Sequence, residues 1–200
     1  MKKQWTISAL AFVLLSPMLA AGAQEDKKKK EKKKPDTYTA VAQGIRGAVG
    51  GRSISLTFRV TEWTSDQEVL ELADLLREGG VDALRRKLEK RRVGRIAPSG
   101  SVGADLAVAR VIEGEDGTRL IRLITARNMP FFELYYAGRS TDYPFGWFEF
   151  VLNEKGKGQG GVIVAARPRF NKEGVLEVES YGLQPIRLVN VRDRTKKKKK

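Results

Sequence analysis

The chain of 200 residues contains no cysteine and no histidine. Without cysteine it has no thiol nucleophile, no disulfide and no cysteine-linked lipid anchor. Without histidine it lacks the side chain that most often serves as a general base near neutral pH, and zinc sites built on either residue are excluded as well. Its stability must come from a hydrophobic core, and we expect neither a metal nor an organic cofactor.

Two common nucleotide and nucleophile signatures are also missing. The sequence has no Gly-x-Ser-x-Gly elbow and no phosphate loop ending in Gly-Lys-Ser/Thr. Residues 156–161 have the glycine spacing of the dinucleotide fingerprint, but an apolar segment typical of a strand follows them. The fingerprint needs a helix N-terminus at that place, so we interpret these glycines as a hairpin turn.

Only one long apolar run occurs in the sequence, from Ile7 to Leu19. Two lysines precede it and Ala21-Gly22-Ala23 follows it, which is the order of a secretory signal peptide. We predict cleavage after Ala23 and export to the periplasm or the exterior of a bacterial cell. A retained anchor helix is the alternative, although the run is shorter than the roughly 20 residues that span a bilayer. After cleavage we expect no membrane span.

Positive charge is concentrated at the two ends of the chain. The formal net charge is +14, residues 27–34 carry seven lysines, and residues 196–200 are all lysine. Between Asp36 and Arg192 the sequence has 23 basic and 20 acidic residues. We therefore divide the chain into a signal peptide (1–23), a disordered lysine-rich linker (24–35), a single globular domain (36–192) and a disordered basic tail (193–200).

These lysine runs suggest an anionic partner. Each lysine near an anionic surface contributes about 1 kcal/mol, so the runs could hold the protein to an anionic cell-envelope polymer. A second interpretation is that they are solvated tails that aid solubility. A third is general polyanion binding, aided by basic residues between Arg85 and Arg92, while we do not expect recognition of a specific nucleic acid. On a helix, that basic cluster is also favoured by the helix dipole.

The central segment predicts an α+β domain made mainly of antiparallel strands. Residues 54–60 alternate between apolar and polar side chains, the period of a half-buried strand, and the glycine-rich residues 37–51 read as a bent strand before it. A capping box at Ser65 and Glu68 opens a helix that Gly79-Gly80 ends, and a second helix runs from Val81 to about Arg91.

After Val93, short apolar runs alternate with turn residues such as Asp116-Gly117 and Glu173-Gly174. They predict strands at 104–112, 119–127, 145–152, 161–167, 175–181 and 185–192, with a short helix at 130–137. The predicted fold has about seven to nine strands in a partly closed barrel, or alternatively a sandwich, with a helical hairpin inserted after the second strand.

Residues 129–150 hold most of the large aromatic side chains. Within this stretch we propose a candidate binding site of Arg139, Asp142, Tyr143, Phe145 and Trp147, because polar anchors beside aromatic rings are typical of ligand pockets. The alternative is structural. Phe148, Phe150 and Leu152 share the face of the strand that we expect to point into the core, and Phe145 and Trp147 are either covered by a helix or exposed.

The same stretch contains Glu133, Asp142 and Glu149, which leaves a polysaccharide hydrolase with two carboxyl groups as an alternative function. Their spacing matches no known signature. We favour the structural explanation, in which Glu149 faces solvent on a strand and Asp142, near Arg139, fixes a turn. No catalytic residue is assigned, and we expect a non-catalytic protein.

The motif Gly138-Arg-Ser-x-Asp-Tyr-Pro-Phe145, the turn at 156–158 and the segment Tyr181-Gly-x-Gln-Pro-Ile-Arg-Leu188 resemble a group of exported bacterial proteins. The resemblance covers most of the chain after the signal peptide. It implies export and transfers no activity and no site residue. The sequence therefore predicts an exported, non-catalytic binding or envelope-associated protein.

Overall fold

The computed structural model of this chain describes residues 34–45, 52–126, 142–180 and 185–195. These residues form ten strands and one helix, so the prediction of a mainly β, α+β domain is confirmed. The elements are β1 Asp36–Ile45, β2 Arg52–Val60, α1 Asp66–Leu88, β3 Gly94–Pro98, β4 Ala104–Leu106, β5 Val108–Glu113, β6 Arg119–Thr125, β7 Phe145–Leu152, β8 Lys157–Phe170, β9 Leu176–Ser180 and β10 Ile186–Asp193. The short helix predicted at 130–137 lies outside the described residues.

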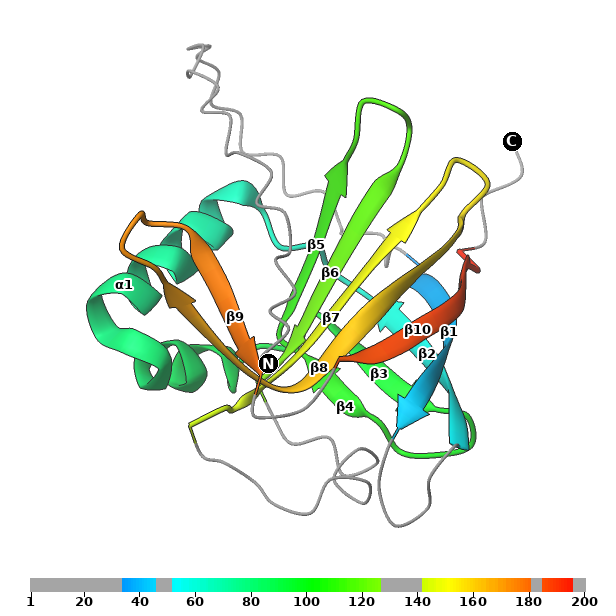
Figure 1. The fold of residues 1–200 in the computed structure, drawn as a ribbon, viewed down its shortest axis with the longest axis horizontal. Coiled ribbons are helices and arrows are strands. Elements are labelled where there is room, and N and C mark those ends of the chain that lie inside the picture. The colour runs from blue at the N-terminus through cyan, green and yellow to red at the C-terminus, as the bar shows by residue number, and fades with distance from the viewer. Residues whose placement is uncertain (1–33, 46–51, 127–141, 181–184, 196–200) are drawn as a thin grey trace, which may run out of the picture.

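All ten strands belong to one antiparallel sheet with the order β4-β3-β2-β1-β10-β8-β7-β6-β5, and β9 pairs with the far end of β8. The two ends of this order meet because β4 and β5 are separated only by Ala107. The Val93 amide donates to the Leu106 carbonyl at 2.8 Å, and the Ala107 amide donates to the Ile124 carbonyl of β6 at 2.8 Å. The sheet is a nearly closed barrel, as predicted, and not a sandwich (Figure 1).

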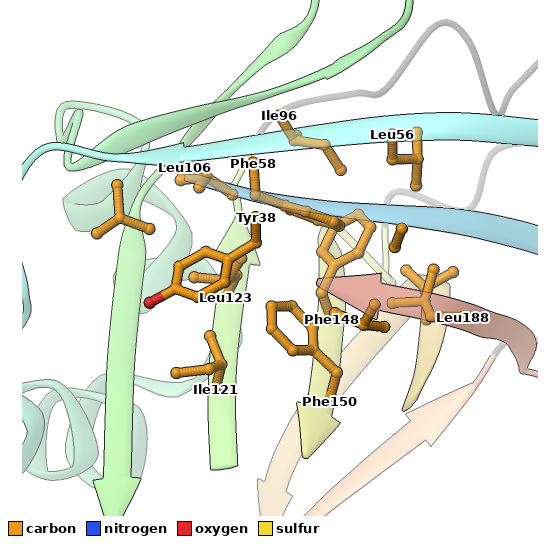
Figure 2. Packing of buried hydrophobic residues seen from close by; sticks show 14 of the residues in the cluster. Tyr38, Leu56, Phe58, Ile96, Leu106, Ile121, Leu123, Phe148, Phe150 and Leu188 are labelled. Carbon is orange, nitrogen blue, oxygen red and sulfur yellow. The ribbon is translucent and has the colours of Figure 1, made fainter. Parts of the chain in front are cut away.

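Apolar side chains from all around the sheet fill the barrel (Figure 2). Phe58 of β2 packs against Phe148 and Phe150 of β7, with ring centroids 5.5 and 5.6 Å apart, and all three side chains are at most 1 % exposed. Leu106, Ile121 and Leu188 complete this layer from β4, β6 and β10. A barrel of about eight strands has an interior just wide enough for side chains to fill it, so this interior is a core.

Strand β8 contains glycines where the sheet curves most closely onto β7. A Cβ atom on Gly160 would overlap the Glu149 carbonyl oxygen and come within 2.5 Å of Phe150 Cβ. The register between the two strands also shifts between Phe145 and Trp147, which marks a β-bulge in β8. Glycines and bulges of this kind are how strands bend to close a barrel.

Helix α1 covers part of the outer surface of the barrel beside the β8–β9 hairpin (Figure 1). The predicted capping box is present, since Ser65 Oγ accepts from the Glu68 amide and the Glu68 carboxylate accepts from the Ser65 amide. The predicted helical hairpin is not confirmed. Only Gly80 leaves helical geometry (φ 68°, ψ −172°), and an antiparallel pair of helices needs a loop of about two to five residues.

The strand count was also slightly too low, for two reasons. Strand β3 (Gly94–Pro98) was missed because it is short, contains glycine and proline, and has one fully buried side chain, Ile96. The predicted strand at 104–112 is divided at Ala107 into β4 and β5, where the chain changes its pairing partner from β3 to β6.

Candidate functional site

The candidate binding residues lie at and just before the start of β7. Asp142 is exposed and Tyr143 half-buried, whereas Phe145 and Trp147 are 1 % and 6 % exposed. Both aromatic side chains belong to a second apolar cluster between α1 and the outer face of the sheet, with Leu76, Leu84, Leu88, Ile163 and Ala166. Arg139 lies outside the described residues. The structure therefore brings Phe145 and Trp147 together as packing residues under a helix, which was the structural alternative.

Glu149 lies on the same face of β7 as Trp147, and its carboxylate forms an ion pair with Arg122. The Arg122 guanidinium lies 2.8 Å from the Glu149 carboxylate and 5.2 Å from the centre of the Trp147 ring. A glycosidase acid must reach the glycosidic oxygen and give it a proton, whereas the Glu149 carboxylate is hydrogen-bonded to Arg122 at 2.8 Å. Glu133 lies outside the described residues. These contacts do not favour the hydrolase alternative, and the described residues contain no group of three potential metal ligands.

A polar cluster lies at the end of the barrel where β1 begins and β10 ends. The Trp63 indole donates to Asp36 at 2.7 Å, and the Arg119 guanidinium donates to Asp193 at 2.9 Å. Tyr38 packs against Trp63, with ring centroids 6.4 Å apart. Burial, followed by the carboxylates of Asp193 and Asp36, raises the pKa of Tyr38 well above its usual value.

Asp193 fixes the C-terminal end of β10 within this cluster. Burial acts to raise the pKa of its carboxyl group, but hydrogen bonds from Thr195 and Arg119 outweigh burial and lower the pKa below its usual range. The Thr195 amide donates to Asp193 at 2.9 Å. The carboxylate is therefore held ionised between β6 and the last described residues of the chain.

The same cluster joins the two ends of the described chain. Tyr38 of β1 is the register partner of Asp193 of β10. One step further, the Arg194 amide donates to the Thr37 carbonyl at 2.7 Å, and the Thr37 amide donates to Thr195 Oγ1 at 3.1 Å. Neighbouring strands lie about 4.8 Å apart, so the two chain ends leave the barrel side by side.

This pairing determines where the lysine runs are attached. The first run, residues 27–34, ends three residues before Thr37, and the second, residues 196–200, begins directly after Thr195. Twelve lysines from opposite ends of the sequence are thus joined to one end of one barrel. The sequence identifies both runs but does not show that they are attached to paired strands, because β-strand alternation does not reveal which strands pair.

By its fold, the chain is a nearly closed antiparallel barrel with one covering helix and paired ends. Among the described residues, no helix is long and apolar enough to cross a membrane. Comparisons with protein-family models, with curated proteins and with solved structures each found no match. The resemblance to exported bacterial proteins therefore stays a prediction.

Proposed function

We propose that this chain is an exported, non-catalytic, envelope-associated protein that binds an anionic cell-envelope polymer through its two lysine runs. The observation that carries the proposal is the pairing of β1 with β10, which attaches both runs to the same end of the barrel. Two tethered binding segments share a high effective concentration, so a polymer held by one run is readily bound by the other.

The packed interior supports a scaffold role over a catalytic one. The barrel is filled by aromatic and aliphatic side chains, and the candidate aromatic residues of β7 lie under α1. The polar cluster at Asp36, Arg119 and Asp193 is used in contacts that hold β1, β6 and β10 together. In this proposal the barrel fixes the positions from which the lysine runs reach their ligand.

The proposed binding is tested with the chain beginning at Gln24 and a variant in which every lysine of residues 27–34 and 196–200 is replaced by glutamine. We expect the unmodified chain to bind sodium polygalacturonate at low salt and to release it as salt rises, because binding displaces condensed counterions. The variant should lose most of this binding. Equal binding by both proteins at low salt would disprove a role for the lysine runs.

Export is tested separately by expressing the full chain in a Gram-negative host and sequencing the N-terminus of the protein recovered from the periplasm and medium. A processed protein that begins at Gln24 is the expected result. An unprocessed chain that remains in the cytoplasm or membrane would contradict export and favour the retained anchor helix.

A further inference from the structure

The charges on the outer surface of the barrel are segregated, although the domain is almost neutral in sum. On the side that carries α1 and the strands near it, arginines are paired with carboxylates. Examples are Arg91–Glu68 at 2.8 Å, Arg122–Glu149 at 2.8 Å and Arg169–Glu179 at 2.9 Å. Arg86, Lys87 and Lys90 near the C-terminal end of α1 are exposed and form no ion pair with described residues, but carboxylates of the same helix, such as Glu71 and Glu78, balance their charge.

The opposite surface, formed by β2, β1 and β10, has a different composition. Its outward side chains are exposed or half-buried, and those described are Ser53, Ser55, Thr57, Arg59, Thr37, Thr39, Val41, Gln43, Arg187, Val189 and Arg192. Among these positions there is no carboxylate and no aromatic ring. The acidic residues of β1 and β10, Asp36 and Asp193, are engaged with Trp63 and Arg119 in the polar cluster.

Three exposed arginines on this surface, Arg59, Arg187 and Arg192, form no ion pair with any residue in the described part of the chain. With Lys157 of β8, also exposed, they define what we call the cationic face. Two carboxylates lie two strands away from these arginines, Asp105 from Arg59 and Glu149 from Arg187, and they form ion pairs with Arg92 at 3.2 Å and Arg122 at 2.8 Å. The cations of this face are therefore available to an external anion.

Strand register arranges the cationic face in rows that start beside the chain ends. Arg59 is opposite Thr37, whose amide and carbonyl bond the C-terminal segment. The next row runs from Thr39 to Arg192 and on to Lys157, and a further row places Arg187 opposite Gln43. With about 3.3 Å between residues and 4.8 Å between strands, the cations extend about 20 Å along the strands, from the Thr37 row to the Gln43 row, and about 14 Å across the sheet from β2 to β8.

The chemistry of this surface favours a linear anionic polysaccharide. Guanidinium groups bind carboxylate and phosphate oxygens with two parallel hydrogen bonds, and the surrounding hydroxyl and amide side chains can bond to sugar hydroxyls. Proteins that bind single-stranded nucleic acid add aromatic side chains on which bases stack, and the outward positions of this face offer none.

We propose that the cationic face is a docking surface for a polysaccharide with a carboxylate or phosphodiester in its repeat. This inference rests on the proposed function and extends it. The runs supply attraction that is insensitive to the ligand's structure, whereas ordered arginines at fixed spacing give a preference for a regularly charged chain.

The test uses the chain from Gln24 with both lysine runs intact and compares two variants of equal charge. The face variant is Arg59→Gln/Arg187→Gln/Arg192→Gln. The control is Arg86→Gln/Lys87→Gln/Lys90→Gln, three exposed cations at the C-terminal end of α1 that make no ion pair with described residues. Thermal unfolding of each variant verifies that the fold is kept. Binding is measured with sodium polygalacturonate, with poly(glycerol phosphate) and with oligodeoxythymidine.

We expect the face variant to bind the two anionic polymers on the order of 100-fold more weakly at low salt, since each cation contributes about fivefold. The control should change binding much less. Loss on one polymer alone identifies whether carboxylate or phosphodiester is preferred. Equal binding by the face variant and the control would overturn the inference, as would a loss confined to oligodeoxythymidine.

These outcomes separate the inference from the proposed function. If the face variant matches the control but glutamines in the lysine runs abolish binding, the tethering function stands and the cationic face is refuted. If the face variant loses binding while the run variant keeps it, the cationic face stands and the lysine runs are not the tether. Absence of polymer binding by the unmodified chain would refute both.

Discussion

Individual residues of β7 and β8 show how closely the barrel wall is packed. Gly160 and Gly161 are adjacent in β8 and differ in the space around them. A Cβ atom at Gly160 would overlap the backbone of β7, whereas one at Gly161 would meet nothing nearer than the Ile186 carbonyl oxygen at 3.6 Å, an ordinary contact. The two positions therefore form a matched pair for mutation.

We predict that Gly160→Ala lowers the free energy of unfolding by about 1–3 kcal/mol, the usual cost of overpacking, because backbone must move to admit the methyl group. Gly161→Ala should leave stability almost unchanged. Urea unfolding of both variants, followed by tryptophan fluorescence, measures the difference. Similar stabilities for the two variants would contradict the close approach of β8 to β7.

Trp147 was a candidate ligand-binding residue, and its position under α1 leads to a different expectation. Trp147→Ala should destabilise the fold by about 3–5 kcal/mol, because it leaves a cavity beside Leu84 and Ile163 and removes the contact with Arg122. Val151→Ala, on the same face of β7 but 46 % exposed, is the control and should cost little. A Trp147→Ala protein as stable as the unmodified chain would restore Trp147 as a binding residue.

At the scale of elements, the sequence predicted what depends on local spacing. Phe148, Phe150 and Leu152 point into the barrel as the period of two requires, and the capping box opens α1. Gly117 and Gly174 have positive φ in the predicted tight turns. Element type and facing direction are local properties, so a single sequence can carry them.

The same sequence could not show which elements meet. Strands β1 and β10 pair across about 150 residues of sequence, and Arg122 finds Glu149 through strand register. The cationic face was missed for the same reason. The count of 23 basic and 20 acidic residues does not show which of these charges form ion pairs. Gly79-Gly80 likewise read as a chain reversal, although one non-helical residue changes only the direction of α1.

The junction of β1, β6 and β10 is an element-level contact that depends on pH. The pKa of Asp193 is lower in the folded protein than its ordinary value of 3.8, so its ionised carboxylate stabilises the fold above about pH 4. This contribution is lost as pH falls from that value through the folded-state pKa. We predict that the free energy of unfolding decreases between pH 5 and pH 2 and that Asp193→Asn reduces this decrease.

Urea unfolding at a series of pH values checks this prediction, with Asp116→Asn as the control. The pKa of Asp116 is also lowered, by hydrogen bonds from Thr118, but this carboxylate is exposed in the β5–β6 turn and joins no distant strands. An unchanged pH dependence in Asp193→Asn would show that Asp193 does not lock the ends of the barrel.

At the scale of the whole molecule, the pairing of β1 with β10 attaches two distant lysine runs to one end of the barrel. The runs are separated by more than 160 residues in sequence, yet Thr37 and Thr195, which lie beside them, are hydrogen-bonded to each other. If both runs bind one polymer chain, neutralising either should remove the advantage of double attachment, which commonly amounts to 10²–10⁴ in affinity. If the two runs bind independently, neutralising one run should remove only the binding free energy that this run contributes.

The most direct test of this account is the affinity for long polygalacturonate of four chains: unmodified, with glutamines in residues 27–34, with glutamines in residues 196–200, and with both. We predict that the affinity of each single-run variant falls most of the way to that of the double variant. With oligomers too short to reach both runs, the unmodified chain should lose the advantage that double attachment gives it. Single-run variants that bind the long polymer as tightly as the unmodified chain would contradict the claim that β1–β10 pairing unites the two runs.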